Sequence, residues 1–311
     1  MSNYGISNTG PGNVNVNGPT AMGKNTRVTV HGSETANAGD TADEALPAPT
    51  RAEEGARREQ VWDAGVITVL PVENSATIDA LARWGTHTER RTQQGVVFHE
   101  FTRAAGARTL RLSLTQSLLP GQHFAGSAVE HLRREYAPRL VALVGIAGSI
   151  HPDVRPGDVV IAQEVVHYEP RKVTSEGTRR RGRGHTVTAG VQHAINAFFT
   201  THGEPWPLPG SEDHRALRGL IGSGEAVLAD VSAEERRYLR EYNEKILAVE
   251  TEGAGLATAV HASTGQTGAA GAWVMVRGIS DAADRQKDDS HHAIASRNAA
   301  YVFSALLPHL T

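Results

Sequence analysis

The feature that most constrains the fold is a series of short apolar runs that begins near Val61 and continues almost to the end of the sequence. A continuous apolar run is typical of a strand that is covered on both faces. Such runs occupy residues 65–70, 140–144, 159–162, 220–222, 246–249 and 273–276. Two other stretches, 95–102 and 108–115, alternate between polar and apolar residues, which is typical of antiparallel strands.

Amphipathic segments with helical spacing lie between these runs. From His123 to Tyr136, apolar residues recur four positions apart, which predicts a helix. Further helices are predicted at residues 188–201, 232–242, 252–263 and 290–307. Strands that alternate with helices predict an α/β fold around a largely buried mixed sheet.

The sequence changes character near residue 60. The first 60 residues are rich in Asn, Gly, Thr, Ala and Pro, and large apolar side chains are sparse. Such a segment buries too little apolar surface to offset its ordering entropy. We therefore expect a flexible tail and linker at residues 1–60 and one globular domain at 61–311. Because residues 12–18 and 27–31 alternate like short strands, a small β module that docks a partner is the alternative.

Composition argues against several classes of protein. A net charge of −3 does not suit a nucleic-acid binder, which needs a dominant basic face. The chain contains no cysteine, which rules out disulfides, thiolate metal sites and a cysteine nucleophile. No segment has the apolar length to cross a bilayer, and the start lacks a signal-peptide pattern. We expect a cytoplasmic protein without a metal, cofactor, membrane or nucleic-acid partner.

Acidic residues follow most of the buried runs. Glu73 follows the first run, Glu250 and Glu252 follow the run near residue 248, and Asp281 follows the last. Ligand sites in open α/β sheets form at the carboxyl ends of strands, so these acids are expected to converge. Converging carboxylates repel one another unless a ligand or partner compensates, which favours a functional site. Taken singly, each acid has an ordinary alternative role as a helix cap, a turn cap or a solvent-facing residue.

Five motifs in a fixed order carry a family resemblance: VGIAGS, GDVVIA, SGEAV, AVETEGAG and VRGISDAAD. Together they resemble the nucleoside phosphorylase superfamily, and especially its methylthioadenosine/S-adenosylhomocysteine nucleosidase branch, across residues 62–308. The resemblance implies a three-layer α/β/α sandwich whose central mixed sheet is partly curled into a barrel. It also implies a homo-oligomeric hydrolase that uses water to cleave the N-glycosidic bond of an adenine-type purine nucleoside or nucleotide.

The resemblance also assigns roles to individual residues. Asp281 matches the acid that protonates or hydrogen-bonds N7 of the departing purine. Glu252 matches the residue that binds the ribose hydroxyls, and Glu73 matches the residue that activates the attacking water. The remaining matches line the sugar and base or the glycine-rich turn beside them: Glu250, Thr251, Ser223, Gly224, Tyr168, Gly145 and Ile146.

The chemistry of glycosidic cleavage accounts for three carboxylates. Breaking the bond places positive charge on the sugar and negative charge on the purine, so an acid at N7 discharges the leaving group. A second carboxylate on the opposite face orients water at the anomeric carbon. A third accepts hydrogen bonds from both hydroxyls of the ribose diol.

The chain departs from the family in the glycine-rich turn at residues 145–149, where Ile146 replaces a hydroxyl-bearing residue. The backbone N–H groups of such a turn remain available to hold an anion or water. Phosphorylases need arginines near the first and central strands, yet residues 70–72 and 143–145 are apolar. Hydrolysis is therefore expected, with phosphate-dependent phosphorolysis as the alternative.

Three other features leave alternatives open. The basic run from Arg179 to Arg183 is interpreted as a solvated loop, although arginines over a pocket would admit the phosphates of a nucleotide. His291 and His292 are interpreted as surface residues that bind no metal. The Asn/Gly-rich start resembles leaders of bacterial multi-domain systems, so a nucleotide-sensing or nucleotide-depleting effector domain is a further alternative.

Overall fold

The computed structural model describes residues 7–8, 14–15, 60–211, 213–228, 230, 232–267, 271–283 and 291–311. The chain divides into two units, residues 1–45 and 46–311. In the first unit, β1 (Ser7–Asn8) pairs antiparallel with β2 (Val14–Asn15). The strand expected at 27–31 and all but the last residue of the linker expected at 47–60 lie outside the described residues, so the domain boundary near residue 60 stays a prediction.

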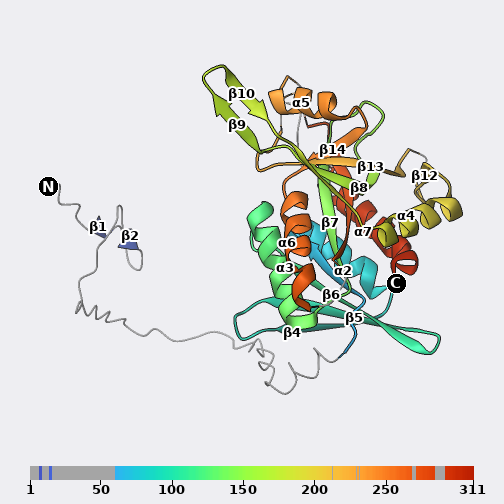
Figure 1. The fold of residues 1–311 in the computed structure, drawn as a ribbon. Helices are drawn as coiled ribbons and strands as arrows, with labels where there is room; N and C mark the ends of the chain where they lie inside the picture. Colours follow the sequence, from blue (N-terminus) through green and yellow to red (C-terminus); the bar gives the residue numbers. More distant parts are fainter. Residues whose placement is uncertain are drawn as a thin grey trace. The chain divides into compact units, whose positions relative to one another are not determined.

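The second unit is built around an 11-stranded mixed sheet (Figure 1). Its strands are β3 (Ala64–Thr68), β4 (Thr86–Arg91), β5 (Val97–Ala105), β6 (Arg108–Gln116), β7 (Leu140–Ser149), β8 (Val159–His167), β11 (Arg183–Thr186), β12 (Trp206–Pro207), β13 (Arg215–Ser223), β14 (Ile246–Glu250) and β15 (Ala272–Asp281). The main order is β11-β8-β13-β14-β7-β3-β6-β5-β4, with β12 on β13 and β15 paired to both β7 and β8.

Five of these strands close into a barrel. Each of β8, β13, β14, β7 and β15 pairs with two others of the group, so the ring has no free edge within it. From β7 the sheet continues outward through β3, β6, β5 and β4. The partly barrel-like mixed sheet expected from the sequence is confirmed.

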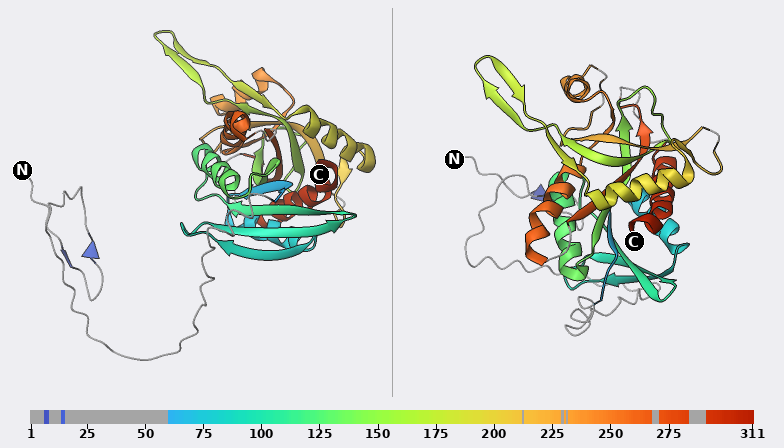
Figure 2. Two further views of the ribbon diagram at one scale, coloured as in Figure 1. Left: turned by 60° about the horizontal axis from the view of Figure 1, so that its bottom comes forward. Right: turned by 45° about the vertical axis from the view of Figure 1, so that its right-hand side comes forward.

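The described helices cover the sheet, most of them in two groups. They are α2 (Pro71–Ala82), α3 (Gln122–Tyr136), α4 (Ala189–His202), α5 (Glu234–Tyr242), α6 (Gly253–Thr267) and α7 (His292–Leu310). α2 and α4 pack on α7, which contacts β7 and β15, whereas α3 packs on α6 (Figures 1 and 2). This gives the expected α/β/α layers. None of the helices that the structure describes has the length and apolarity needed to span a membrane.

Local sequence explains where several elements start and stop. Leu140 to Val144 in β7 are all buried, because the strand is covered by helices on both sides. α3 ends at Tyr136; its C-cap, Ala137, has a left-handed backbone (φ 45°), and Pro138 follows it. At the start of α4, the Thr188 hydroxyl accepts a hydrogen bond from the N–H of Val191.

The prediction of a turn at residues 145–149 is wrong, because β7 continues as a strand to Ser149. β15 pairs with β7 along this stretch, with Gly145 opposite Arg277, and β14 pairs with its end, with Gly148 opposite Val249. Barrel closure therefore extends a strand through glycines whose local preference favours a turn.

The basic run from Arg179 to Arg183 is not a loop, although Arg179, Arg181 and Arg183 are exposed to solvent as interpreted. β9 (Arg171–Thr174) and β10 (Gly177–Arg180) form an antiparallel hairpin that projects from the domain in Figures 1 and 2. The Arg180 side chain is only 6% exposed and pairs with Glu235 of α5. The hairpin escaped prediction because its strands are polar and lack the alternation that marks a half-buried strand.

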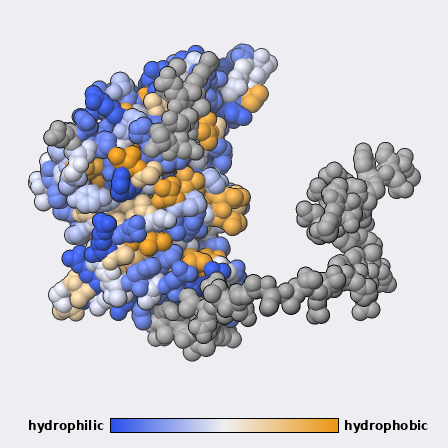
Figure 3. Space-filling view, turned by 180° about the vertical axis from the view of Figure 1, so that it is seen from behind, coloured by the Kyte–Doolittle hydropathy of each residue, from blue (hydrophilic) through white to orange (hydrophobic). Residues whose placement is uncertain are grey.

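Seen from behind in Figure 3, most of the surface is hydrophilic, and apolar side chains gather at mid-height on this face. The large apolar side chains that are most exposed among the described residues include Leu118, Leu119, Val173 and Val227. Two of these, Leu119 and Val227, lie in segments that reach the cavity described next.

Candidate active site

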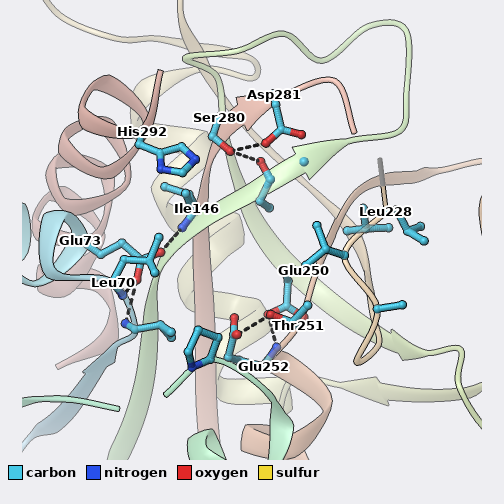
Figure 4. A pocket seen from close by; sticks show the side chains of 17 residues that line it. Leu70, Glu73, Ile146, Leu228, Glu250, Thr251, Glu252, Ser280, Asp281 and His292 are labelled. Atoms are coloured by element: carbon cyan, nitrogen blue, oxygen red, sulfur yellow. Dashed lines mark hydrogen bonds between the residues drawn. The ribbon is translucent and has the colours of Figure 1, made fainter. Parts of the chain in front are cut away.

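A cavity of about 200 Å³ opens where β3, β7, β14 and β15 end (Figure 4). The side chains that line it come from segments far apart in the sequence. They are Val69, Leu70, Glu73, Pro120, Ile146, Ala147, Gly148, Ala226, Val227, Leu228, Val249, Glu250, Thr251, Glu252, Ser280, Asp281 and His292. Six residues predicted for the site therefore share one cavity: Glu73, Ile146, Glu250, Thr251, Glu252 and Asp281.

Glu73 lies in the first turn of α2 and is almost fully buried. Its Oε2 accepts hydrogen bonds from the N–H groups of Val69 and Leu70 at 2.7 and 2.8 Å. Its Oε1 accepts one from the N–H of Ile146 at 2.8 Å, which ties α2 to β7. Burial raises the pKa of the Glu73 carboxyl, and the Arg277 charge and these three N–H groups offset only part of that rise.

The Glu250 carboxylate holds the start of α6. It accepts hydrogen bonds from the N–H groups of Glu252 (3.0 Å) and Gly253 (2.9 and 3.0 Å). It also accepts one from Nη2 of Arg277. Glu250 lines the cavity, but its carboxylate mainly caps the start of α6 and pairs with the buried Arg277 guanidinium.

Glu252 is oriented from three directions. Its Oε1 accepts hydrogen bonds from the N–H of Gly121, at 3.0 Å, and from the Thr251 hydroxyl. Its Oε2 accepts one from Nη2 of Arg277 at 2.9 Å. Three fixed donors leave the carboxylate little rotational freedom, so its remaining lone pairs are held in fixed directions.

Arg277 is fully buried and joins these acids. Burial alone would lower the pKa of its guanidinium, but the carboxylates of Glu250, Glu252 and Glu73 raise it further than burial lowers it. The three acids carry more negative charge than one arginine neutralises. The part of the cavity wall that these acids form is therefore electronegative and suits a neutral or cationic group better than an anion.

Asp281 ends β15 on another wall of the cavity. Its Oδ1 accepts a hydrogen bond from the N–H of Ala283 at 2.8 Å, and its Oδ2 lies 2.7 Å from the Ser280 hydroxyl. In Figure 4, Asp281 and Ser280 reach the cavity from one side and Glu73 from another. The site thus offers carboxyl groups to two different parts of one ligand.

Four residues predicted for the site do not line this cavity and instead support its walls. The Ser223 hydroxyl accepts a hydrogen bond from the N–H of Ala254 at 3.0 Å, which fixes the start of α6. Tyr168 is buried against Gly224, where a Cβ would overlap its ring. A Cβ on Gly145 would overlap both Arg277 and Glu73.

Sequence reasoning missed three polar residues in or beside the cavity: Ser280 and His292, which line it, and Arg277, which pairs with its acids. His292 was interpreted as a surface residue, but it is half-buried and lines the cavity. The signal for Arg277 was present, because a lone cation inside a buried strand requires acidic partners. No group of three or more metal-ligating side chains occurs among the residues whose positions are described.

Comparison with known proteins identifies the family of the chain. The profile of the phosphorylase superfamily matches residues 64–308. ATP nucleosidase Cap17 of Escherichia coli is 24% identical over 264 residues, which cover 78% of this chain and 50% of Cap17, so the chain spans about half the length of that relative. The 5'-methylthioadenosine/S-adenosylhomocysteine nucleosidase of Pseudoalteromonas translucida is 30% identical over 57% of this chain and 71% of that protein.

A solved structure matches the fold. The S-adenosylhomocysteine nucleosidase of Streptococcus pyogenes superposes with a TM-score of 0.63 at 20% identity, over 81% of this chain and 98% of that one. The family match and the partly closed sheet lead to one conclusion: the chain belongs to the phosphorylase superfamily and resembles its methylthioadenosine/S-adenosylhomocysteine nucleosidase branch.

Proposed function

We propose that the protein is a nucleosidase that hydrolyses the N-glycosidic bond of an adenine-type nucleoside or nucleotide. One observation carries the proposal: a single cavity holds Asp281 on one wall, buried Glu73 on another, and Glu252 fixed by Arg277. The names of the relatives, which are nucleosidases of adenine compounds, support the same substrate class.

The geometry supports a different role for each of the three acids Asp281, Glu73 and Glu252. Asp281 donates a proton or hydrogen bond to N7 as the C–N bond breaks and the base takes up the bonding electrons. Glu73 accepts a proton from water, whose oxygen forms the new bond to the anomeric carbon. Glu252 accepts hydrogen bonds from the ribose hydroxyls. Free base and ribosyl product leave, Glu73 releases its proton to solvent, and Asp281 takes up a proton in place of any that it gave to the base.

The charge balance favours hydrolysis over phosphorolysis. A phosphate nucleophile needs a free cation beside the anomeric carbon. Arg277, the cation that pairs with these acids, is not among the residues that line the cavity, and its Nη2 donates to Glu250 and Glu252. Glu73 adds a further negative charge, which repels phosphate but suits water.

The test is release of free base, resolved by chromatography, from adenosine, methylthioadenosine, S-adenosylhomocysteine, inosine, AMP and ATP, with and without phosphate. ATP is included because one relative is an ATP nucleosidase by name. We expect release without phosphate, and loss of release in Asp281→Asn but not in Asp153→Asn, whose side chain is 78% exposed. Release that requires phosphate would establish a phosphorylase, and no release from any substrate would favour a sensor.

We also propose that the protein forms a homo-oligomer with the cavity near the contact between copies. Val227 (64% exposed) lines the cavity, Leu118 (83%) and Leu119 (53%) directly precede Pro120, which also lines it, and all three are left uncovered in one copy. Sedimentation of the wild type and of Leu118→Asp tests this. A monomeric wild type would contradict it.

A cytoplasmic location and the absence of nucleic-acid binding remain proposals. The lack of cysteine and the net charge of −3 support them. Fractionation of cells and a retardation assay with DNA and RNA are the direct tests.

A further inference from the structure

The turn that follows Asp281 has an unusual backbone. Ala283 has φ 49°, in the left-handed region that non-glycine residues rarely adopt, and it is buried. This conformation brings the N–H of Ala283 to 2.8 Å from Oδ1 of Asp281. The orientation of the proposed acid therefore depends on a strained turn that some other group must hold in place.

A side chain from α5 holds this turn. Nη1 of Arg236 donates hydrogen bonds to the carbonyl oxygens of Ala282, at 3.1 Å, and Ala283, at 3.2 Å. The two hydrogens of one guanidinium nitrogen thus bind two successive carbonyls. Hydrogen bonds from a charged donor are stronger than neutral ones, so this contact resists relaxation of the turn.

Contacts of neighbouring residues hold α5 in place, and they therefore also fix the position of Arg236. Arg180 of the β9–β10 hairpin pairs with Glu235 at 2.6 Å, one residue from Arg236. The Tyr238 hydroxyl accepts a hydrogen bond from the N–H of Gly182 at 2.8 Å, and Leu239 is fully buried beneath the helix. Contacts on both sides of Arg236 hold the helix to the domain.

We propose that Arg236 is a positioning residue for Asp281: its guanidinium fixes the Ala282–Ala283 turn, and the turn fixes the carboxyl that meets the leaving base. The inference rests on the proposed function, because it assigns Arg236 a role in the departure of the base. The Ser280 hydroxyl holds Oδ2 and the turn holds Oδ1, so loss of Arg236 weakens one of the anchors that the described residues provide.

The test compares kcat, KM and thermal unfolding of Arg236→Ala, Arg236→Lys and the wild type with the preferred adenine substrate. We expect kcat of Arg236→Ala to fall roughly 10- to 100-fold, because small displacements of a catalytic group have effects of that size. KM should stay within about threefold, because the ribose contacts of Glu252 are untouched. Arg236→Lys should lie between the two, since an ammonium can still donate to both carbonyls.

Arg237→Ala is the matched control. Arg237 is the next residue of the same helix, carries the same charge and is exposed. We expect its kcat and KM to equal those of the wild type. A loss in Arg237→Ala as large as that in Arg236→Ala would mean that charge on α5, and not the held turn, is responsible, and would overturn the inference.

The remaining outcomes separate this inference from the proposed function. If the wild type releases base and Arg236→Ala keeps its kcat, or loses only thermal stability, the inference alone is overturned. If Arg236→Ala does not fold, Arg236→Lys decides: a lowered kcat at unchanged KM supports the inference, and a wild-type kcat overturns it. If the wild type itself releases no base, both fall together.

Discussion

Charge imbalance is the main property of the site at the scale of single residues. Glu73, Glu250 and Glu252 approach one buried arginine, Arg277. An ion pair of this kind contributes little net stability, because desolvation offsets the attraction between the charges. It does, however, fix the positions of the carboxylates, and a fixed carboxylate is what a reaction with developing positive charge requires.

The dependence of the site on Arg277 is testable by Arg277→Met, which keeps the bulk and removes the charge. We expect the free energy of unfolding to fall by about 3–5 kcal/mol, because buried carboxylates lose their cation. Urea unfolding of both proteins measures it. Arg179→Met, at a site that is 69% exposed and paired with Glu176, is the control, with an expected change of about 0–1 kcal/mol. Equal stability of Arg277→Met and wild type would contradict the account.

The raised pKa of Glu73 predicts the pH dependence of activity. A general base acts only when ionised, so kcat/KM should fall as the pH decreases through the pKa of Glu73. Because burial raises this pKa, the midpoint should lie above the ordinary glutamate value of 4.5. A pH profile of kcat/KM measures it, and Glu176→Gln, an exposed acid, should leave it unchanged. A midpoint at or below 4.5 would argue against Glu73 as the base.

The acids of the site could be predicted from the sequence, but the arginines that position them could not. The acids were found because family motifs place them at strand ends, and Glu73, Glu252 and Asp281 do share one cavity. Arg277 and Arg236 were not, because their roles depend on which strands and helices become neighbours. Glu250 and Arg277, for example, meet only once β14 and β15 both pair with β7.

At the scale of elements, the extended ends of the long strands contribute residues to the site. The apolar runs predicted where most strands begin, but β7, β8 and β15 continue well beyond their apolar part. In β7, the extension contains Gly145, which faces Arg277 and Glu73 where a side chain would not fit. A glycine inside a strand is costly in isolation, so its presence indicates close approach of other groups.

Gly145→Ala therefore tests an element-scale requirement. Its Cβ would overlap the Arg277 guanidinium and the Glu73 carboxylate, so we expect loss of both activity and stability. Gly190→Ala is the matched control, because nothing lies within 4 Å of a Cβ at that position in α4. That variant should be active and more stable by about 0.5–1 kcal/mol, since alanine favours a helix. Full activity in Gly145→Ala would contradict the packing described here.

At the scale of the whole molecule, barrel closure could not be read from local patterns. Alternating strands and helices predict an α/β fold, but they do not say that β15, the last strand, inserts between β7 and β8. That insertion brings Asp281 into the same cavity as Glu73, which lies near the other end of the domain's sequence. The family resemblance supplied the barrel, and propensity alone would not have done so.

The same scale yields a prediction about the division of the chain. All the described residues of the cavity lie between Val69 and His292, and the compact unit that contains them begins at residue 46. Removal of residues 1–45 should therefore leave kcat, KM and the thermal unfolding midpoint unchanged, measured against the full chain with the same substrate. If base release instead fell while the midpoint stayed constant, the first 45 residues would contribute to substrate handling or assembly. Sedimentation of both proteins would then separate a change in oligomeric state from a change in the site.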